Sequence, residues 1–256
     1  MATANSWRLP QIEFHLAWEA MGRDRMPFPL AFHTNAETQL DFERECRSAA
    51  KSLVDKIGDD DSLYRALQAL AQPQVRVEML GYRRDGRDRM VRVSAGIDDG
   101  IGTVAAQHPG PDIESGGDIL IFMHSPSFVV KRVASILPDV PPGSAAGIDV
   151  HREDLAPEER AWTASHTPTP REAAARFFNR PYRTYVEIRI DTGPALDGWE
   201  EGGRYLQVVD FVDEGRYLVQ VSERLVATPV TKDRLEAEIQ RRIDRAMVEA
   251  HETAWS

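Results

Sequence analysis

Cysteine is almost absent from this chain of 256 residues, and the single Cys46 excludes a framework of intramolecular disulfides. No apolar run approaches the ~20 residues that a membrane-spanning helix needs, and the first eight residues lack the apolar core of a secretory signal. Positive charge is scarce, since 31 Lys and Arg residues stand against 41 Asp and Glu residues. The resulting net charge of −10 disfavours non-specific binding to nucleic acid or anionic membranes. We therefore expect a cytoplasmic protein.

Recognisable catalytic and ligand-binding motifs are also missing. The seven histidines do not fall in a His-x-x-x-His spacing, and one cysteine cannot form a Cys-x-x-Cys pair. His124-Ser125 lacks the Gly-x-Ser-x-Gly frame of a nucleophile elbow. Gly100-Ile101-Gly102 is not followed by the Gly-Lys-Ser/Thr of a phosphate loop. We expect no metal, no nucleotide or other cofactor, and no enzymatic activity.

A repeated pattern is the most informative feature that is present. Pro73 and Pro181 each end a helical segment and precede a strand, and they are 108 positions apart. The helices that close the two units are expected to open at Ser125 and Thr231, 106 positions apart. Residues 138–147, rich in Pro and Gly, read as a linker between the units. The sequence thus predicts one α+β domain over residues 1–256, with pseudo-symmetric halves at about 1–140 and 148–256 that share an antiparallel sheet.

Helix signals bracket the strands of both halves. Thr34 with Glu37, and Thr169 with Glu172, have the spacing of capping boxes. Cys46 lies on an apolar stripe of the first of these helices, where a buried and inert thiol is the expectation. Further helices are expected over 10–21, 62–71, 125–137 and from 231 onward, and strands near 7–9, 75–80, 89–95, 101–106, 119–123, 148–150, 184–190, 204–211, 216–221 and 225–229.

The central strands alternate apolar and polar side chains. This period of two is typical of an antiparallel sheet with one covered face, so we expect helices on one side of the sheet only. The other face would meet water or a partner, and it would carry Arg76, Glu78, Arg92, Glu187 and Arg189. A solvated face is the better interpretation for any single one of these residues.

The order of elements resembles the EspG family, the ESX secretion-associated chaperones of type VII secretion in mycobacteria and related actinobacteria. The segments that carry the resemblance are Trp18-Glu19-Ala20-Met21-Gly22, Met26-Pro27-Phe28-Pro29-Leu30, Gly215-Arg216-Tyr217-Leu218-Val219 and Val226-Ala227-Thr228-Pro229. The resemblance implies a quasi-two-fold α+β fold with a central antiparallel sheet and a C-terminal helical bundle. It also implies a chaperone that keeps PE–PPE heterodimers soluble by covering the hydrophobic tip of the PPE protein.

In the family, the partner meets the open sheet, the first hairpin loop and the C-terminal helices. By resemblance, the hairpin loop over residues 83–89 would carry Arg83, Arg84 and Arg87 as steering cations, and Tyr185 is the candidate apolar anchor on the sheet. A solvated hairpin turn is the alternative for the loop. We expect a monomer or weak dimer. An enzyme without a familiar motif, favoured by a deep pocket with perturbed titratable groups, and a structural adaptor are the alternative functions.

Overall fold

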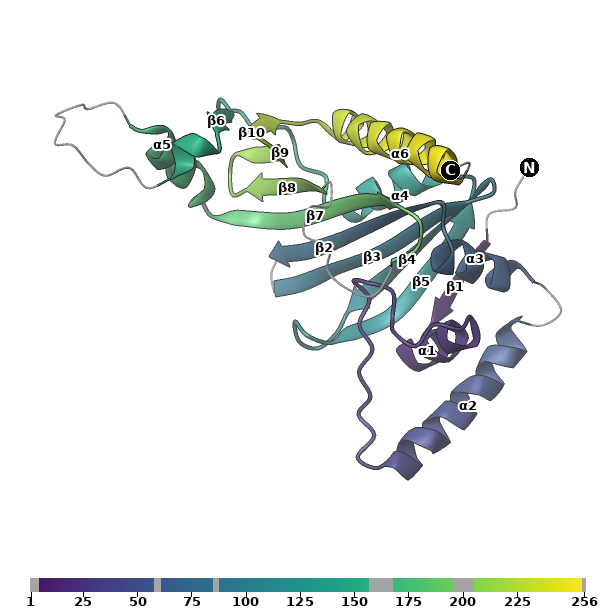
Figure 1. The fold of residues 1–256 in the computed structure, drawn as a ribbon. Coiled ribbons are helices and arrows are strands. Elements are labelled where there is room, and N and C mark those ends of the chain that lie inside the picture. Colours follow the sequence, from purple (N-terminus) through teal and green to yellow (C-terminus); the bar gives the residue numbers. More distant parts are fainter. Residues whose placement is uncertain (1–4, 58–60, 85–87, 157–167, 196–204, 255–256) are drawn as a thin grey trace.

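The computed structural model describes residues 5–57, 61–84, 88–156, 168–195 and 205–254. These residues form an α+β fold around one ten-stranded antiparallel sheet (Figure 1). The first part of the chain contains β1 (Asn5–Leu9), α1 (Gln11–Ala20), α2 (Gln39–Ile57), α3 (Ser62–Ala71), β2 (Val75–Arg84), β3 (Asp88–Asp98), β4 (Ile101–Pro109), β5 (Gly116–His124) and α4 (Ser127–Ile136). The second part contains β6 (Ile148–His151), the 3₁₀ helix η1 (Glu153–Leu155), α5 (Pro170–Phe178), β7 (Tyr182–Thr192), β8 (Tyr205–Phe211), β9 (Gly215–Val221), β10 (Arg224–Pro229) and α6 (Lys232–Ala254).

The sheet joins the two parts of the chain through its central strands. Its order is β1-β5-β4-β3-β2-β7-β8-β9-β10-β6, so each part contributes five neighbouring strands and β2 pairs with β7. Read outward from the centre, the first part runs β2, β3, β4, β5, β1 and the second runs β7, β8, β9, β10, β6. The connections follow the same order in both parts, and the predicted shared antiparallel sheet is confirmed.

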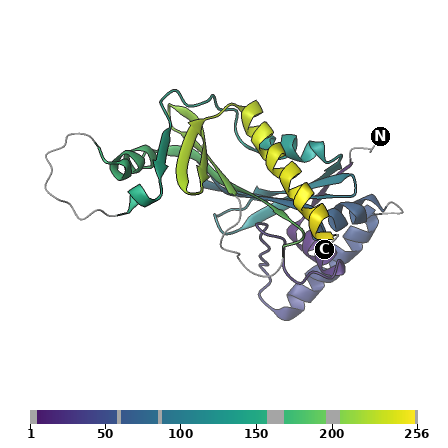
Figure 2. The same cartoon turned by 45° about the horizontal axis from the view of Figure 1, so that its top comes forward.

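Helices cover both faces of the sheet, and the predicted one-sided arrangement is wrong. Neighbouring residues of one strand show this, because their side chains point to opposite faces. Val104 packs with α4 in one apolar cluster, whereas Ala105 packs with α1 and α3 in another. Val208 and Val209 divide in the same way between the α4–α6 cluster and the cluster around Phe177 of α5. Figure 2 shows α6 crossing the sheet while α1, α2 and α3 lie beyond it.

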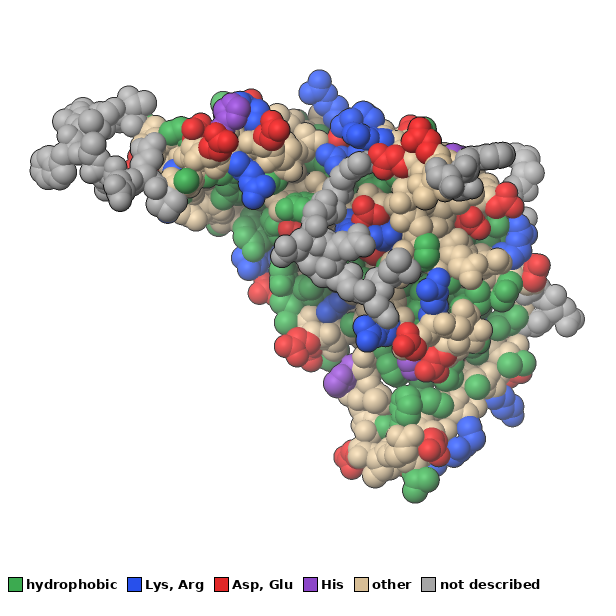
Figure 3. All heavy atoms as spheres, in the orientation of Figure 1, with side chains coloured by type: hydrophobic (Ala, Val, Ile, Leu, Met, Phe, Trp, Pro, Cys, Tyr) green, Lys and Arg blue, Asp and Glu red, His purple; other side chains and the backbone are tan. Residues whose placement is uncertain are grey.

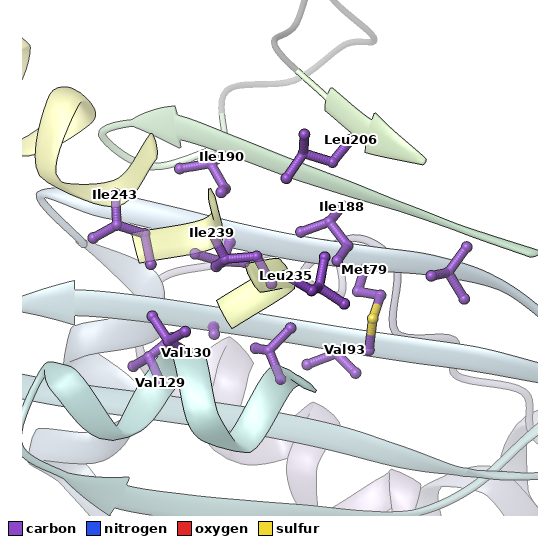
Figure 4. Packing of buried hydrophobic residues seen from close by; sticks show 14 of the residues in the cluster. Met79, Val93, Val129, Val130, Ile188, Ile190, Leu206, Leu235, Ile239 and Ile243 are labelled. Carbon is purple, nitrogen blue, oxygen red and sulfur yellow. The ribbon is translucent and has the colours of Figure 1, made fainter. Parts of the chain in front are cut away.

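The largest core lies between the sheet and the pair α4 and α6. Met79 and Val93 from the first part meet Ile188 and Leu206 from the second beneath the α6 residues Leu235, Ile239 and Ile243 (Figure 4). These side chains are nearly or completely buried. The apolar seam predicted for the last helix is therefore confirmed, and it holds together strands from both parts of the chain.

Local sequence signals set most of the helix starts. Thr169 accepts a hydrogen bond from the Glu172 amide and Glu172 returns one to the Thr169 amide, which confirms this capping box. Thr231 caps α6 through a hydrogen bond of 3.3 Å from the Arg234 amide. The capping box predicted at Thr34 and Glu37 is wrong, because the helix begins about one turn later, at Gln39. The cap of α2 is Thr38, whose hydroxyl accepts from the Asp41 amide and donates to its carboxylate.

Ser125 does not cap α4 with its side chain. The helix begins at Ser127, with Pro126 at the cap position and no side-chain capping bond. Ser125 instead accepts a hydrogen bond from the Phe128 amide through its carbonyl. The proline supplies the preset backbone angle that starts the helix.

α2 is the least buried of the long helices. Only Ala49 and Leu53 are buried on it, and it rests on α1. The buried Glu13 carboxylate of α1 accepts hydrogen bonds from Lys56 at 2.6 Å and from Ser52 at 2.8 Å, which fastens the two helices together. Cys46 is only partly buried, which corrects the expectation of a buried thiol, and its pKa is raised mainly by the loss of solvent around it.

The predicted linker is fastened to the second part of the sheet. Arg216 is completely buried and donates to both carboxylate oxygens of Asp210 and to the carbonyl of Pro138 at 2.7 Å. The Arg216 amide also donates to the carbonyl of Pro141. A buried guanidinium needs such a full set of acceptors, because an unpaired buried charge costs several kcal/mol.

Candidate partner-binding surface

Alternate side chains of β2 and β7 form a polar surface at the centre of the sheet. Arg76 of β2 pairs with Gly96 of β3, so the two residues face the same side of the sheet. At Gly96 this side is covered by α3, because a Cβ there would meet the backbone of Ala69. The polar surface therefore lies on the face that carries α3. We call this surface the central polar face. Its cross-strand pairs are Arg76–Asp191, Glu78–Arg189, Leu80–Glu187 and Tyr82–Tyr185, with Arg92 and Ser94 added by β3 and Tyr205 and Gln207 by β8.

Six of the nine predicted partner-binding residues meet on the central polar face. They are Arg76, Glu78, Arg92, Tyr185, Glu187 and Arg189. The interpretation of this face as solvated is wrong for Glu78 and Arg92, which are 5% and 7% exposed. Arg92 donates to the carbonyls of Ile113, Glu114 and Ser115, so it holds the β4–β5 connection over the sheet. Its pKa is lowered by burial.

One end of the central polar face is an ionic network. Asp191 accepts from Arg76 at 3.1 Å and from Arg189. Arg76 also donates to the carbonyls of Thr192 and Gly193 at 2.8 and 3.1 Å, which fixes the chain directly after β7. Glu78 forms a longer ion pair, since its nearest cationic atom is Arg76 Nε at 3.6 Å. Burial raises the pKa of Glu78, against the opposing effect of Arg76 and Arg189.

The other end of the central polar face is rich in tyrosine. Three of the six tyrosines of the chain gather there, and we call them the tyrosine patch: Tyr82, Tyr182 and Tyr185. The rings of Tyr182 and Tyr185 lie 6.0 Å apart between centroids. Tyr185 donates to Glu187 at 2.8 Å, and Gln207 donates to the same carboxylate oxygen. Burial and this carboxylate raise the pKa of Tyr185, so its hydroxyl stays a donor.

Of the three arginines predicted for the hairpin loop, the structure describes Arg83 and Arg84, and these two have different contacts. β2 extends to Arg84 and β3 begins at Asp88, so Arg83 and Arg84 belong to the strand and not to the loop that the sequence predicted. Arg83 donates to the carbonyl of Ile136 at the end of α4. Arg84 lies 4.5 Å above the ring of Tyr182 and pairs with Asp88 at 3.3 Å. Arg87 lies outside the described residues.

A cleft of about 690 Å³ opens beside the ionic network. One wall is the chain after α1. It is held by Trp18 of α1, whose ring nitrogen donates to the Arg25 carbonyl at 2.7 Å. The floor is formed by Arg76, Glu78, Arg189 and Asp191. Phe28 stands in the wall with 43% of its surface exposed. The cleft therefore combines an aromatic wall with a charged floor, in which Glu78 is buried and the other three residues are partly exposed.

Sequence reasoning missed several residues of this surface. Tyr82 could have been found by continuing the period of two in β2 beyond Leu80, and Asp191 by continuing that of β7 beyond Ile190. Phe28 carried no comparable signal, because only the tertiary structure places the chain after α1 against β2 and β7.

The described residues contain neither a metal-binding cluster nor a membrane-spanning helix. Within the residues that the structure describes, no three His, Cys, Asp or Glu side chains are grouped as a metal ion would require. The described helices include none with the length and apolar character to cross a membrane. Figure 3 shows acidic and basic side chains interspersed over the visible surface.

Comparison with known protein families supports the resemblance that the order of elements indicated. None of the curated proteins compared with the chain matches it. The model of the EspG family matches residues 11–241, which is most of the chain and spans all elements from α1 into α6. The chain therefore belongs to the EspG family, a family of type VII secretion-associated chaperones.

Proposed function

We propose that this protein is a cytoplasmic chaperone that binds a PE–PPE-type heterodimer of an actinobacterial type VII secretion system. It would cover the apolar tip of the PPE protein until the pair is secreted. The observation that carries this proposal is the tyrosine patch, which borders the partly buried apolar side chains of Leu80 and Met90 on neighbouring strands. Tyrosine, methionine and arginine are enriched in protein interfaces, and such a cluster suits the capture of an apolar tip.

Binding in this proposal needs no chemistry and no nucleotide. Burial of apolar surface contributes roughly 25 cal/mol per Å², and a few central aromatic residues carry most of the affinity. The hydroxyls of the patch suit an interface that must remain soluble when empty, because they keep hydrogen bonds to Glu187 or to water. Arg84 at the edge of the patch, with Arg87, would steer an acidic rim of the client.

The proposal includes the organisation of the chain. We regard residues 1–256 as a single domain whose halves, about 1–140 and 148–256, are pseudo-symmetric copies. The matching order of strands outward from β2 and β7 supports this. One client would then be bound by one chain, consistent with a monomer or weak dimer.

Two tyrosines on the central strands provide the test. The variant Tyr82→Ala/Tyr185→Ala should bind the co-expressed PE–PPE heterodimer at least about tenfold more weakly, because central aromatic residues of an interface contribute about 2 kcal/mol or more each. Affinity would be measured by calorimetry with the heterodimer recovered by co-purification from the source cytoplasm. Tyr64→Ala is the matched control, since Tyr64 is 55% exposed on α3 and lies outside the patch.

Unchanged affinity in the double variant, with the control also unchanged, would remove the patch from the interface. Failure of any PE–PPE pair to co-purify with the wild-type protein would contradict the proposed client itself.

A further inference from the structure

The cleft beside the ionic network holds a carboxylate that its own surroundings do not satisfy. Glu78 is 5% exposed, and no described residue donates a hydrogen bond to it. Its closest cationic atom, Arg76 Nε, is 3.6 Å away and is itself buried without a hydrogen-bond partner. A carboxylate that faces a cleft without a protein donor is free to accept a hydrogen bond from a ligand that enters the cleft.

The charges around Glu78 restrict the donor to a neutral group. Among the described residues, seven ionisable side chains line the cleft, four of them arginines and three acidic. Arg76 and Arg189 already flank Glu78, so an ammonium or guanidinium ligand would meet two like charges. An anionic ligand would meet the Glu78 carboxylate, while the two terminal nitrogens of Arg76 are occupied by Asp191 and by the carbonyls of Thr192, Gly193 and Pro194. A neutral N–H or O–H group avoids both conflicts.

The walls of the cleft indicate what the donor is attached to. Met26, Phe28 and Leu70 line it, and Phe28 leaves 43% of its surface exposed. A large exposed aromatic side chain next to a cavity favours an apolar partner, and rings of this kind pack edge to face or offset on each other. The volume of about 690 Å³ is within the range of sites that enclose a compact ligand.

We infer that this cleft receives an aromatic side chain that carries a hydrogen-bond donor, a tryptophan or tyrosine of the secreted client, with its ring against Phe28 and its N–H or O–H on Glu78. This inference rests on the proposed function, because the client supplies the side chain. The cleft and the tyrosine patch lie toward opposite ends of β2 on one face of the sheet, so an elongated client can reach both.

N-acetyltryptophanamide tests the cleft without any client. In protein-observed NMR, this neutral probe should bind saturably and shift the indole N–H signal of Trp18, which lies in the wall of the cleft. N-acetyl-1-methyltryptophanamide lacks the ring N–H and should bind about tenfold more weakly or worse, because a hydrogen bond to a charged group is lost. Glu78→Met should weaken the first probe to the same extent, whereas Glu78→Gln keeps an acceptor and should retain part of the binding.

Three results would overturn the inference. They are no saturable shift with the first probe, equal binding of the two probes to the wild-type protein, and unchanged binding to Glu78→Met when its spectrum shows the native fold. None of these depends on a PE–PPE pair, so this test can fail while the proposed function stands, and the co-purification can fail while the cleft still binds the probe.

Discussion

For Glu78 and Arg92, burial outweighs the opposing effect of charged neighbours on the pKa. Glu78 shows this best, because the loss of water raises its pKa in spite of two arginines nearby. The folded state then holds the proton more firmly than the unfolded state. Its contribution to stability is present below the ordinary pKa of about 4.3 and is lost as the pH rises through the raised value.

Glu78→Gln should remove this pH dependence. We expect the stability of the wild-type protein relative to the variant to decrease as the pH rises from about 4 to 7. Urea denaturation at a series of pH values measures the difference. A wild-type advantage that grows with pH would show that Arg76 and Arg189 outweigh the desolvation of the carboxylate.

The elements differ in how firmly they are attached. α6 is fixed by a long buried seam, whereas α2 has two buried residues and the ion pair between Glu13 and Lys56. Because Glu13 is almost completely buried, removal of its cation leaves a buried carboxylate with Ser52 as its remaining partner.

Lys56→Met should therefore loosen α2 selectively. The unsatisfied carboxylate should cost about 1–3 kcal/mol, and the loss should be local because α2 rests mainly on α1. Hydrogen exchange followed by mass spectrometry should show faster exchange over Gln39–Ile57 and unchanged exchange over β2 and β7. Lys51→Met on the exposed side of the same helix is the control, and equal exchange in the two variants would contradict a fastening role for the ion pair.

On the scale of the whole molecule, the two parts of the chain depend on each other. The main core takes Val77 and Met79 from the first part, Val186 and Ile188 from the second, and closes them under α6. Separation would expose this core together with the unpaired edges of β2 and β7.

A chain divided in the linker, between Gly143 and Ser144, should accordingly fold only as a complex. We expect residues 1–143 and 144–256 to be soluble and to co-purify when expressed together, and each to aggregate when expressed alone. Size-exclusion chromatography and circular dichroism would decide the matter. Two fragments that fold separately would mean that the shared sheet adds little to the stability of either part.

Sequence alone determined the elements, since their signals are local. The strand period around Val77 and Val186, the capping box at Thr169 and Glu172, and the seam of Leu235, Ile239 and Ile243 each arise within a few residues. The repeat of about 108 positions predicted the shared antiparallel sheet, and the order of elements identified the EspG family. The sequence also brought together six residues of the candidate surface, because alternate positions of paired strands share a face.

Only the tertiary structure decided what those six residues do there. The polar stripe on β2 and β7 looked solvated because alternation records side-chain polarity and not what lies above it. The chain after α1 and the β4–β5 connection come back over this stripe, bury Glu78 and Arg92, and enclose the cleft at Phe28. Helices on both faces were missed for a different reason: the prediction relied on the alternation in the central strands, whereas β4 and β8 are apolar on adjacent residues such as Val104 and Ala105. Contacts between segments distant along the chain leave no local period, and they set the burial and charge of the surface.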